Sequence, residues 1–392
     1  MRGPRSWRTR DGKAFGVGLL AVVGAFIAFG GAGAAGSSAS GSIYGNGLKL
    51  TTKVVVTGPI KRVVGPWLRW NDKTCSYQRT TDHPAVYVAS TRKIAGSVTI
   101  GYMDYGDTDP FGIANSRSVK SVAAQAGFRL NVYNLQYPST TAPINDAKLS
   151  VVRHDRGVLQ GNLDPSVLPA FFRILEGQGC IPSIALYGGT GDPRPSIGAI
   201  YADTGTLQGQ YLAKQAKKRG YVPAQTAFVQ CTDPTLSSFI AAMFPAAAKA
   251  VTASGFALPP QNLFQLNCSG QSSTNAVASV KAWLTGHPTF KYLMFNAPDD
   301  ERSTGIIAAL KSMGKLNNDS MNVGAGLDQV GQAQVRTGAE TASIAFFPEN
   351  AGKYLIPMLE DVMAGNAVPQ FVEQAIYVVD KTNIDKYYPA KH

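Results

Sequence analysis

From Ser97 onward the sequence alternates short apolar runs with longer amphipathic segments. The apolar runs predict strands at residues 97–103, 128–134, 157–162, 181–188 and 196–202, and again at 225–231, 262–268, 291–296, 321–327 and 342–347. The segments between them have the spacing of helices that bury one face. Strands that alternate with such helices form βαβ units on a parallel sheet. Two runs of five strands therefore predict an α/β protein with two doubly wound parallel-sheet lobes.

The N-terminus predicts secretion. Five basic residues precede an apolar run over residues 14–29, and the small residues Ala32-Gly33-Ala34 follow it. This order is typical of a cleaved signal peptide, here residues 1–34, and predicts a periplasmic mature chain. The alternative is an uncleaved membrane anchor, because the apolar stretch approaches the roughly 20 residues that span a bilayer. No cysteine directly follows the run, which argues against a lipoprotein.

Residues 35–97 do not share the alternating pattern. They begin Gly/Ser-rich and then contain Trp67, Trp70 and Cys75 among turn residues, without a sustained period. A stretch of this kind predicts an N-terminal arm that packs on the first lobe, and not a third domain.

Net charge argues against nucleic-acid binding. The formal charge is +12, of which residues 1–34 supply four. The remaining excess is spread over short clusters such as KRVV and AKQAKKRG, without interleaved aromatic residues. Such clusters are typical of a solvated surface.

The loop GYMDYGDTDPFG, residues 101–112, follows the first strand of this alternating series. Ligands of open parallel sheets bind beyond the carboxyl ends of the strands, so this loop predicts a ligand site. Its candidates are Asp104, Tyr105, Asp107, Asp109 and Phe111. Alternatively, the aspartates are caps and turn formers and the aromatic residues form walls. A metal site is disfavoured, because the EF-hand spacing and its final Glu are absent.

Five segments recur in the order found in one known family. They are IGYMDYGDTDPFGIANSRSVKSVAAQAGFRLNVYN, NLDPSVLPAFFRILEGQGCIPSIALYG, YADTGTLQGQYLA, GHPTFKYLMFNAPDDERSTGIIAAL and VGAGLDQVGQAQVRTG. Together they resemble the periplasmic sugar-binding proteins of ribose and galactose type, over roughly residues 98–390. The resemblance implies the type I periplasmic binding protein fold, in which two lobes are joined by a three-strand hinge.

The resemblance also implies ligand contacts. Asp109 takes the place of an Asn that bonds sugar hydroxyls, and Phe111 that of an aromatic residue that stacks on the pyranose. Asp299, or Asn296 in its stead, follows the third strand of the second lobe. Asp328 matches the Asp of a Gly-Phe-Asp element. These are the polar contacts that a sugar requires, since its hydroxyls both donate and accept.

This chain departs from the family pattern at several positions. Tyr187-Gly188 replaces an Asp-Arg pair, Ser238 lies near the position of a second Arg, and Phe346 replaces a Gln. Loss of both arginines makes a ribose-like contact set doubtful. With Tyr102, Tyr105 and Phe111, the aromatic replacements predict a cleft for a larger or less hydroxylated ligand than ribose.

No catalytic constellation is present in the sequence. None of the four histidines has metal or triad spacing. The run Asp299-Asp300-Glu301 suggests paired carboxylates, but acids at a helix start more commonly meet the positive end of the helix dipole. We therefore expect neither an enzyme nor a cofactor nor a metal site.

The resemblance implies a secreted solute-binding protein, a monomer, that captures a sugar-like molecule and delivers it to an ABC permease in the inner membrane. The alternative is a periplasmic receptor that docks a chemoreceptor or sensor kinase. Lobe one would comprise residues 98–202 and 346–372, and lobe two residues 203–345 and 373–392. The three crossings between them would act as a hinge.

Four cysteines follow the signal segment, and an oxidising compartment permits them to pair. Cys231 and Cys268 end consecutive predicted parallel strands, which should be neighbours. Neighbouring strands lie about 4.8 Å apart, within the range that a disulfide needs. Cys75 and Cys180 would then pair and tie the arm to lobe one. The alternative is that all four are buried thiols.

Overall fold

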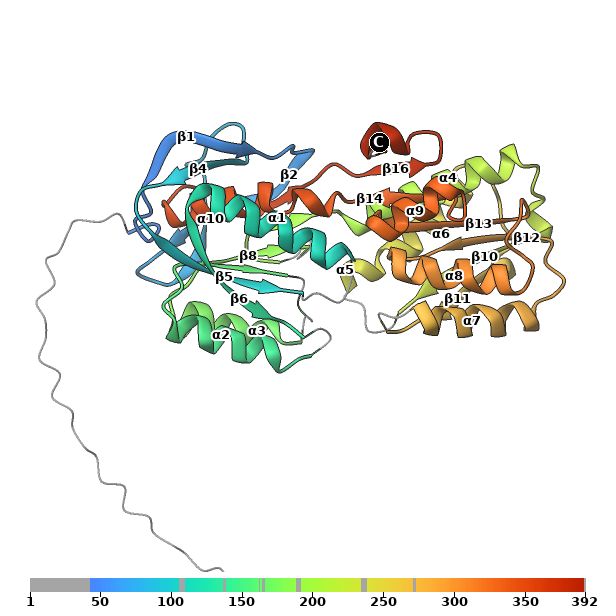
Figure 1. Ribbon diagram of the computed structural model, residues 1–392, viewed down its shortest axis with the longest axis horizontal. Coiled ribbons are helices and arrows are strands. Elements are labelled where there is room, and N and C mark those ends of the chain that lie inside the picture. Colours follow the sequence, from blue (N-terminus) through green and yellow to red (C-terminus); the bar gives the residue numbers. More distant parts are fainter. Residues whose placement is uncertain are drawn as a thin grey trace, which may run out of the picture. The chain divides into compact units, whose positions relative to one another are not determined.

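The computed structural model describes residues 43–105, 110–136, 139–161, 163, 166–187, 192–233, 238–270 and 273–390. Within them the chain forms two large sheets with helices on both faces, as the alternating sequence pattern predicted (Figure 1). The predicted signal peptide lies outside the described residues. Among the described residues, no helix has the length and apolar character needed to cross a membrane.

The first sheet has eight strands in the order β3-β2-β15-β9-β8-β7-β5-β6. Their bounds are β2 Arg62–Asn71, β3 Ser76–Thr80, β5 Val98–Asp104, β6 Phe128–Asn134, β7 Val158–Gln160, β8 Ser183–Leu186, β9 Ser196–Gly198 and β15 Val368–Glu373. The six strands from β6 to β15 in this order are parallel to one another.

Helices cover both faces of this first sheet (Figure 1). Helices α1 (Pro110–Ala126) and α10 (Gly352–Met363) pack on one face, and α2 (Ala142–Val152) and α3 (Leu168–Phe172) on the other. Each face has its own apolar core, in which Ile100 points to one side and Met103 to the other. The alternation of side chains along a strand produces this division.

The second sheet has six strands in the order β11-β10-β12-β13-β14-β16. Their bounds are β10 Thr226–Thr232, β11 Leu263–Asn267, β12 Tyr292–Asn296, β13 Ser320–Gly326, β14 Ala342–Ala345 and β16 Tyr377–Asp380. All neighbours are parallel except β14 and β16. The predicted doubly wound sheet is confirmed, and β16 alone runs antiparallel at its edge, because the chain re-enters this sheet from the last crossing in the opposite direction.

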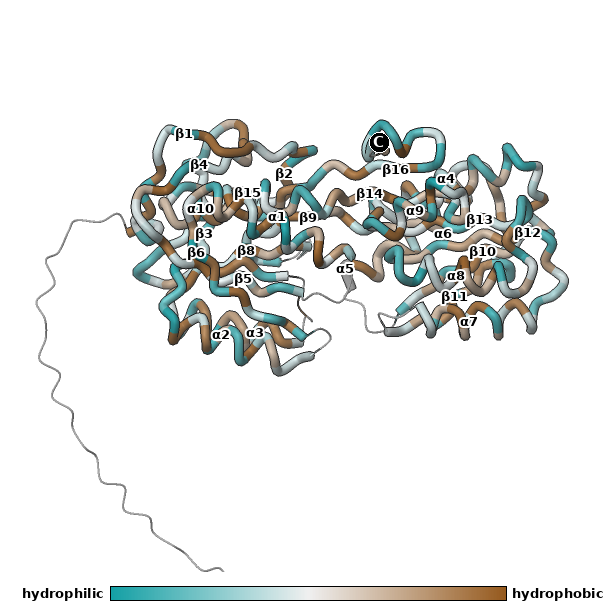
Figure 2. Tube along the Cα trace, in the orientation of Figure 1, coloured by the Kyte–Doolittle hydropathy of each residue, from teal (hydrophilic) through white to brown (hydrophobic). Residues whose placement is uncertain are grey.

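Helices also cover both faces of the second sheet. They are α4 (Tyr201–Lys218) and α6 (Met243–Ala253) on one face, and α7 (Ser273–Gly286) and α8 (Asp300–Ser312) on the other. The short α5 (Ser238–Ala241), α9 (Gln329–Thr337) and α11 (Ile384–Tyr387) complete this lobe. In α7 the buried residues recur at helical spacing, as Ala276, Val280, Trp283 and Leu284. Figure 2 shows the resulting alternation of hydrophobic and hydrophilic residues along α7.

The N-terminal arm is more regular than the sequence predicted. It contains four strands, of which β1 (Leu50–Thr57) and β4 (Ser90–Ile94) form a separate antiparallel ribbon. Strand β2 pairs antiparallel with β15, so the arm extends the first sheet. Both pairings contain register shifts. These irregularities break the alternation of apolar and polar residues by which strands are recognised.

Three segments cross between the sheets. They connect β9 to α4, β14 to the turn Pro348–Asn350, and β15 to β16. The predicted strand 196–202 is therefore wrong in its second half, because α4 already begins at Tyr201. Gln374 joins all three crossings: its backbone N–H donates to Gly198 O (3.1 Å), and its side chain donates to Phe346 O (2.7 Å).

All four cysteines are paired. Cys231 is bonded to Cys268 with a Cα separation of 5.5 Å, and Cys75 to Cys180 with a separation of 4.8 Å. These are the two pairs expected from the order of the strands. The second bond ties the turn between β2 and β3 to the residues that precede β8.

A buried acid links the arm to α10. The Glu360 carboxylate is 1 % exposed, and it accepts a hydrogen bond from the backbone N–H of Arg92 in β4 (2.9 Å). Burial raises the pKa of Glu360 from 4.5 to about 8. Because the folded state then binds this proton more tightly than the unfolded state, the stability it contributes is complete below pH 4.5 and is lost as pH rises through 8.

We expect Glu360→Gln to remove this pH dependence. Each pKa unit corresponds to about 1.4 kcal/mol. As pH rises from 5.5 to 7.5, the free energy of unfolding of the variant should therefore increase by about 2–3 kcal/mol relative to that of the parent. Urea unfolding at the two pH values measures the difference. Glu349→Gln, at an exposed acid, serves as the control. A constant difference between parent and Glu360→Gln at both pH values would contradict the prediction.

Candidate functional site

The carboxyl ends of the central strands bring the predicted site residues to the facing edges of the two lobes. In the first lobe, β5 and β8 end just before Tyr105 and Tyr187. In the second lobe, β12 ends at Asn296, and Asp328 follows β13. Ligands of this sheet type bind at such edges.

Four aromatic side chains form a cluster at these edges and the hinge. Ring centroids are separated by 5.8 Å between Phe111 and Tyr187, 6.3 Å between Phe111 and Phe346, and 6.0 Å between Tyr187 and Phe346. Tyr201 joins the cluster with its ring 5.8 Å from that of Phe346. The structure thus brings together three of the residues that the sequence placed in an aromatic cleft. Tyr201 was missed, because it was assigned to the strand 196–202.

Tyr187 is held in the cluster by an unusual backbone conformation. It has φ of +59°, and its N–H donates to Ile197 O (2.6 Å). Gly198 leaves room for the ring, since a Cβ at that position would lie 2.5 Å from Tyr187 Cδ1. Residues other than glycine rarely adopt positive φ and do so where surrounding structure requires it. A larger residue at Gly198 would therefore displace Tyr187.

Phe111 reaches the second lobe. It lies in the first turn of α1, and its Cδ2 atom is 3.4 Å from the position of a Cβ on Gly326, the last residue of β13. Tyr105 packs elsewhere, against Gly161 after β7, where a Cβ would lie 2.8 Å from Tyr105 Cε2. Asp107 and Asp109 lie outside the described residues, so their predicted roles stay predictions.

Asp328 caps α9 and is almost fully buried. Its Oδ1 accepts from the N–H groups of Val330 (2.7 Å) and Gly331 (3.0 Å). Oδ2 has no hydrogen-bond partner among the described residues. Burial raises the pKa of Asp328, while the hydrogen bonds from the Gly331 and Val330 N–H groups lower it in part. One carboxylate oxygen thus has a structural role, while the other can accept a bond from a ligand.

The other two polar candidates of the second lobe are engaged by the protein. Asp299 caps α8 by accepting from Arg302 N (2.8 Å), and it also pairs with the Arg302 guanidinium. The Asn296 amide is fully buried and donates to Gln208 Oε1 (3.0 Å). Gln208 in turn donates to Ala297 O (2.9 Å). Both residues support the edge of the sheet, and their predicted ligand contacts stay predictions.

A network of buried acids underlies Asp328 and was not anticipated from the sequence. Asp300 Oδ2 accepts from the Asp328 N–H (2.8 Å), and Oδ1 accepts from Ser343 (2.9 Å). Burial raises the pKa of Asp300 well above its usual range, and the nearby Glu340 and Asp328 raise it further. Glu340 itself accepts from Ser303 (2.6 Å). The sequence showed Asp300 only as one of three acids at a helix start.

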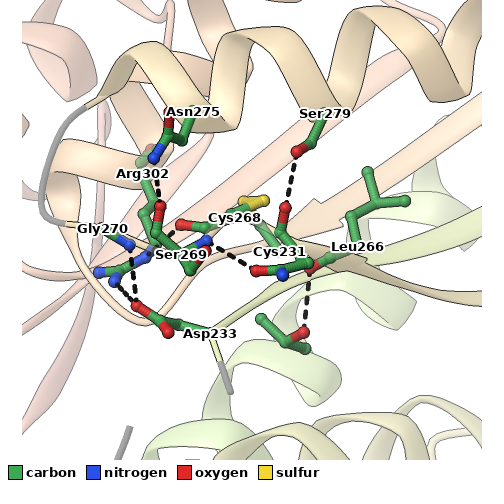
Figure 3. Close-up of a disulfide and its surroundings, with 12 residues drawn as sticks. Cys231, Asp233, Leu266, Cys268, Ser269, Gly270, Asn275, Ser279 and Arg302 are labelled. Atoms are coloured by element: carbon green, nitrogen blue, oxygen red, sulfur yellow. Dashed lines mark hydrogen bonds and ion pairs between the residues drawn. A yellow bond between two sulfur atoms is a disulfide. The ribbon is translucent and has the colours of Figure 1, made fainter. Parts of the chain in front are cut away.

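Arg302 joins three elements beside the Cys231–Cys268 disulfide (Figure 3). It is 4 % exposed, its Nε donates to Cys268 O (3.1 Å), and its terminal nitrogens pair with Asp233 and Asp299. Asp233 follows β10 and is also buried. The ends of β10 and β11 are thus fixed to the start of α8. No cluster of side chains suited to a metal ion occurs in the described part of the chain.

Comparisons with known proteins agree with this architecture. Residues 189–367 match the family model described as periplasmic binding protein domain. No curated protein gives a significant match. The resemblance inferred from the sequence is therefore confirmed by the family model over those residues.

Solved structures extend the similarity to most of the chain. A protein from Mycobacterium smegmatis in complex with beta-D-fucofuranose has 19% identity and a TM-score of 0.65, covering 74% of this chain and 94% of that one. An ABC transporter solute-binding protein from Actinobacillus succinogenes 130z with bound D-allose has 17% identity and a TM-score of 0.62, covering 74% and 100%. A periplasmic ribose ABC transporter protein from Conexibacter woesei DSM 14684 has 17% identity and a TM-score of 0.63, covering 76% and 96%. The predicted type I periplasmic binding protein fold is confirmed.

Proposed function

We propose that this chain, which has the type I periplasmic binding protein fold, captures a sugar-like small molecule between its lobes and delivers it to an ABC permease of the inner membrane. The aromatic cluster of Phe111, Tyr187, Tyr201 and Phe346 carries the proposal. It lies at the carboxyl edges where ligands of this fold bind. The sugars and polyols bound to similar solute-binding proteins, such as D-allose and myo-inositol, support this substrate class.

The site chemistry suits a ligand with one apolar face. The rings of Phe111 and Phe346 can cover the C–H face of a sugar, and Asp328 Oδ2 can accept a hydroxyl hydrogen bond. The free oxygen of Asp328 is buried, so a bond from a ligand would satisfy an acceptor that the described protein groups leave unpaired. Asp109, Tyr105, Asn296 and Asp299 complete the proposed set of ligand contacts.

The proposal includes secretion through a cleaved signal peptide, residues 1–34, and action in the periplasm as a monomer without a cofactor. The order of basic, apolar and small residues at the N-terminus supports it. The described cysteines, all in disulfides, suit an oxidising compartment.

A thermal-shift screen of sugars and polyols followed by calorimetry tests the proposal, because a ligand that binds only the folded state raises the melting temperature. For the strongest hit, Asp328→Asn should weaken binding by about 1.5–3 kcal/mol, the contribution of a hydrogen bond to a charged group. Asn can retain the cap of α9, so the fold should persist. Phe111→Ala should weaken binding at least about tenfold, or about 1.4 kcal/mol.

The matched controls are Asp319→Asn, at an exposed acid, and Tyr377→Ala, at an exposed ring of β16. Both should bind the hit like the parent. If no sugar or polyol shifts the melting temperature, the substrate class is wrong. If a hit binds Asp328→Asn and Phe111→Ala as tightly as the parent, the site is wrong.

A further inference from the structure

Four charged side chains meet where the arm, the third crossing and the first helix of the second lobe come together. Lys61 Nζ lies 2.7 Å from Glu373 Oε1 and 3.6 Å from Asp203 Oδ2. Arg62 pairs with Glu373 through Nε and with Asp203 through Nη2, at 3.1 Å from Asp203 Oδ2. We call these four residues the arm cluster.

Glu373 anchors the arm cluster. Its carboxylate is fully buried, and Lys61 and Arg62 offset the cost of burying the charge, each by pairing with one of its two oxygens. The backbone fixes the same geometry: Arg62 lies opposite Glu373 in the β2–β15 ladder, and Lys61 N–H donates to Glu373 O (3.0 Å). The backbone and both ion pairs therefore place the two basic residues of the arm at the end of β15.

The end of β15 is also the hinge. Glu373 lies opposite Gly198 in the β15–β9 ladder, and the next residue, Gln374, donates to Gly198 O and Phe346 O. The arm therefore runs beside the three crossings as a fourth segment. It differs from them because it belongs to the first sheet alone, through β2 and β3.

Asp203 connects this fourth segment to the second lobe. It lies in the first turn of α4, which packs on α6 and on the second sheet. Any rotation of the second lobe about the hinge moves Asp203 relative to Lys61 and Arg62. The Asp203 side chain is 39 % exposed, so its ion pairs are weak and can break and re-form.

We propose that the arm is a fourth hinge element, which holds the second lobe through Asp203 and limits the range of angles that the lobes sample. Weak ion pairs suit this role, because lobe closure is an equilibrium between states that differ by little free energy. The inference rests on the proposed function in one respect: binding of the ligand is what closes the two lobes.

Asp203→Asn tests the inference, since it cuts the link to the second lobe and leaves Glu373 paired. Spin labels at Lys148→Cys on α2 and Lys311→Cys on α8, both exposed, report the distance between the lobes. Without ligand, Asp203→Asn should broaden the distance distribution, and high salt should broaden that of the parent in the same way. The control Asp385→Asn removes an exposed ion pair with Arg336 that lies within the second lobe, and should leave the distribution unchanged.

Equal distributions in the parent and Asp203→Asn would overturn the inference. Broadening by Asp385→Asn to the same extent would also overturn it, because the effect would not depend on the arm. The ligand-free measurement separates the two proposals. A screen in which no sugar binds, together with a broadened Asp203→Asn distribution, refutes the proposed function and supports the fourth hinge element.

Discussion

Replacing both Cys75 and Cys180 by alanine should lower the free energy of unfolding by about 4–5 kcal/mol. The bond closes a loop of 105 residues, and on the chain-entropy model a loop of about 100 residues gives roughly 4.7 kcal/mol. It is also a covalent cross-link between the arm and the first lobe, in addition to the backbone connection that leads into β5. The ladder between β2 and β3 and the hydrogen bond from Tyr77 to Ser183 O (2.9 Å) also hold β3 in place.

Denaturant unfolding of the oxidised variants measures this loss. The matched comparison is the double replacement of Cys231 and Cys268, whose loop of 37 residues predicts a smaller loss of about 3.8 kcal/mol. Peptide mapping without reduction confirms that the remaining bond is intact in each variant. A larger loss from the Cys231–Cys268 replacement would contradict the ranking, and would mean that the arm is held mainly by other contacts.

The central strands could be predicted from the sequence because both of their faces are buried. All residues of β12 and β13 are buried, so each appears as a run of mostly apolar or small residues, with one Asn in each. The arm strands could not be predicted. Strand β1 is exposed or half-buried along its whole length, so its sequence carries no burial signal. Its pairing with β4 depends on a partner more than 30 residues away.

The aromatic part of the site followed from position and residue type together. Phe111 lies in the loop that follows one predicted strand, and Tyr187 lies at the end of another, where the fold places ligands. The roles of the acidic candidates Asp299 and Asp328 could not be decided from the sequence, for a physical reason. An Asp at the start of a helix can cap it, bind a ligand or do both, and only the structure shows that Asp299 and Asp328 are caps.

Arg302 could not have been assigned a role from sequence. It follows three acids at a helix start, and a basic residue at such a position does not indicate a particular structural or functional role. Its partner Asp233 lies 69 residues earlier in the sequence. The two residues meet because β10 and β12 are parallel neighbours, so that Asp233 after β10 lies beside the start of α8 after β12. Long-range ion pairs of this kind are specified by the topology and not by any local pattern.

Arg302→Met should therefore lower the free energy of unfolding by about 3–5 kcal/mol. Removing one partner of a buried ion pair leaves the other charge unpaired in a site that water cannot reach. Asp233 would be left as a buried carboxylate without this cation, although the Gly270 N–H would still donate to it at 3.3 Å. Cys268 O would lose the bond from Arg302 Nε as well.

Two further variants separate this mechanism from a general loss of packing. Arg302→Met combined with Asp233→Asn should recover part of the stability, because the unpaired charge is gone. Lys311→Met removes an exposed cation from the same helix and should change stability by less than about 0.5 kcal/mol. If the double variant is less stable than Arg302→Met alone, the cost does not come from the Asp233 charge.

Since Arg302 ties the ends of β10 and β11 to α8, Arg302→Met should also weaken ligand binding at the edge that carries Asp328.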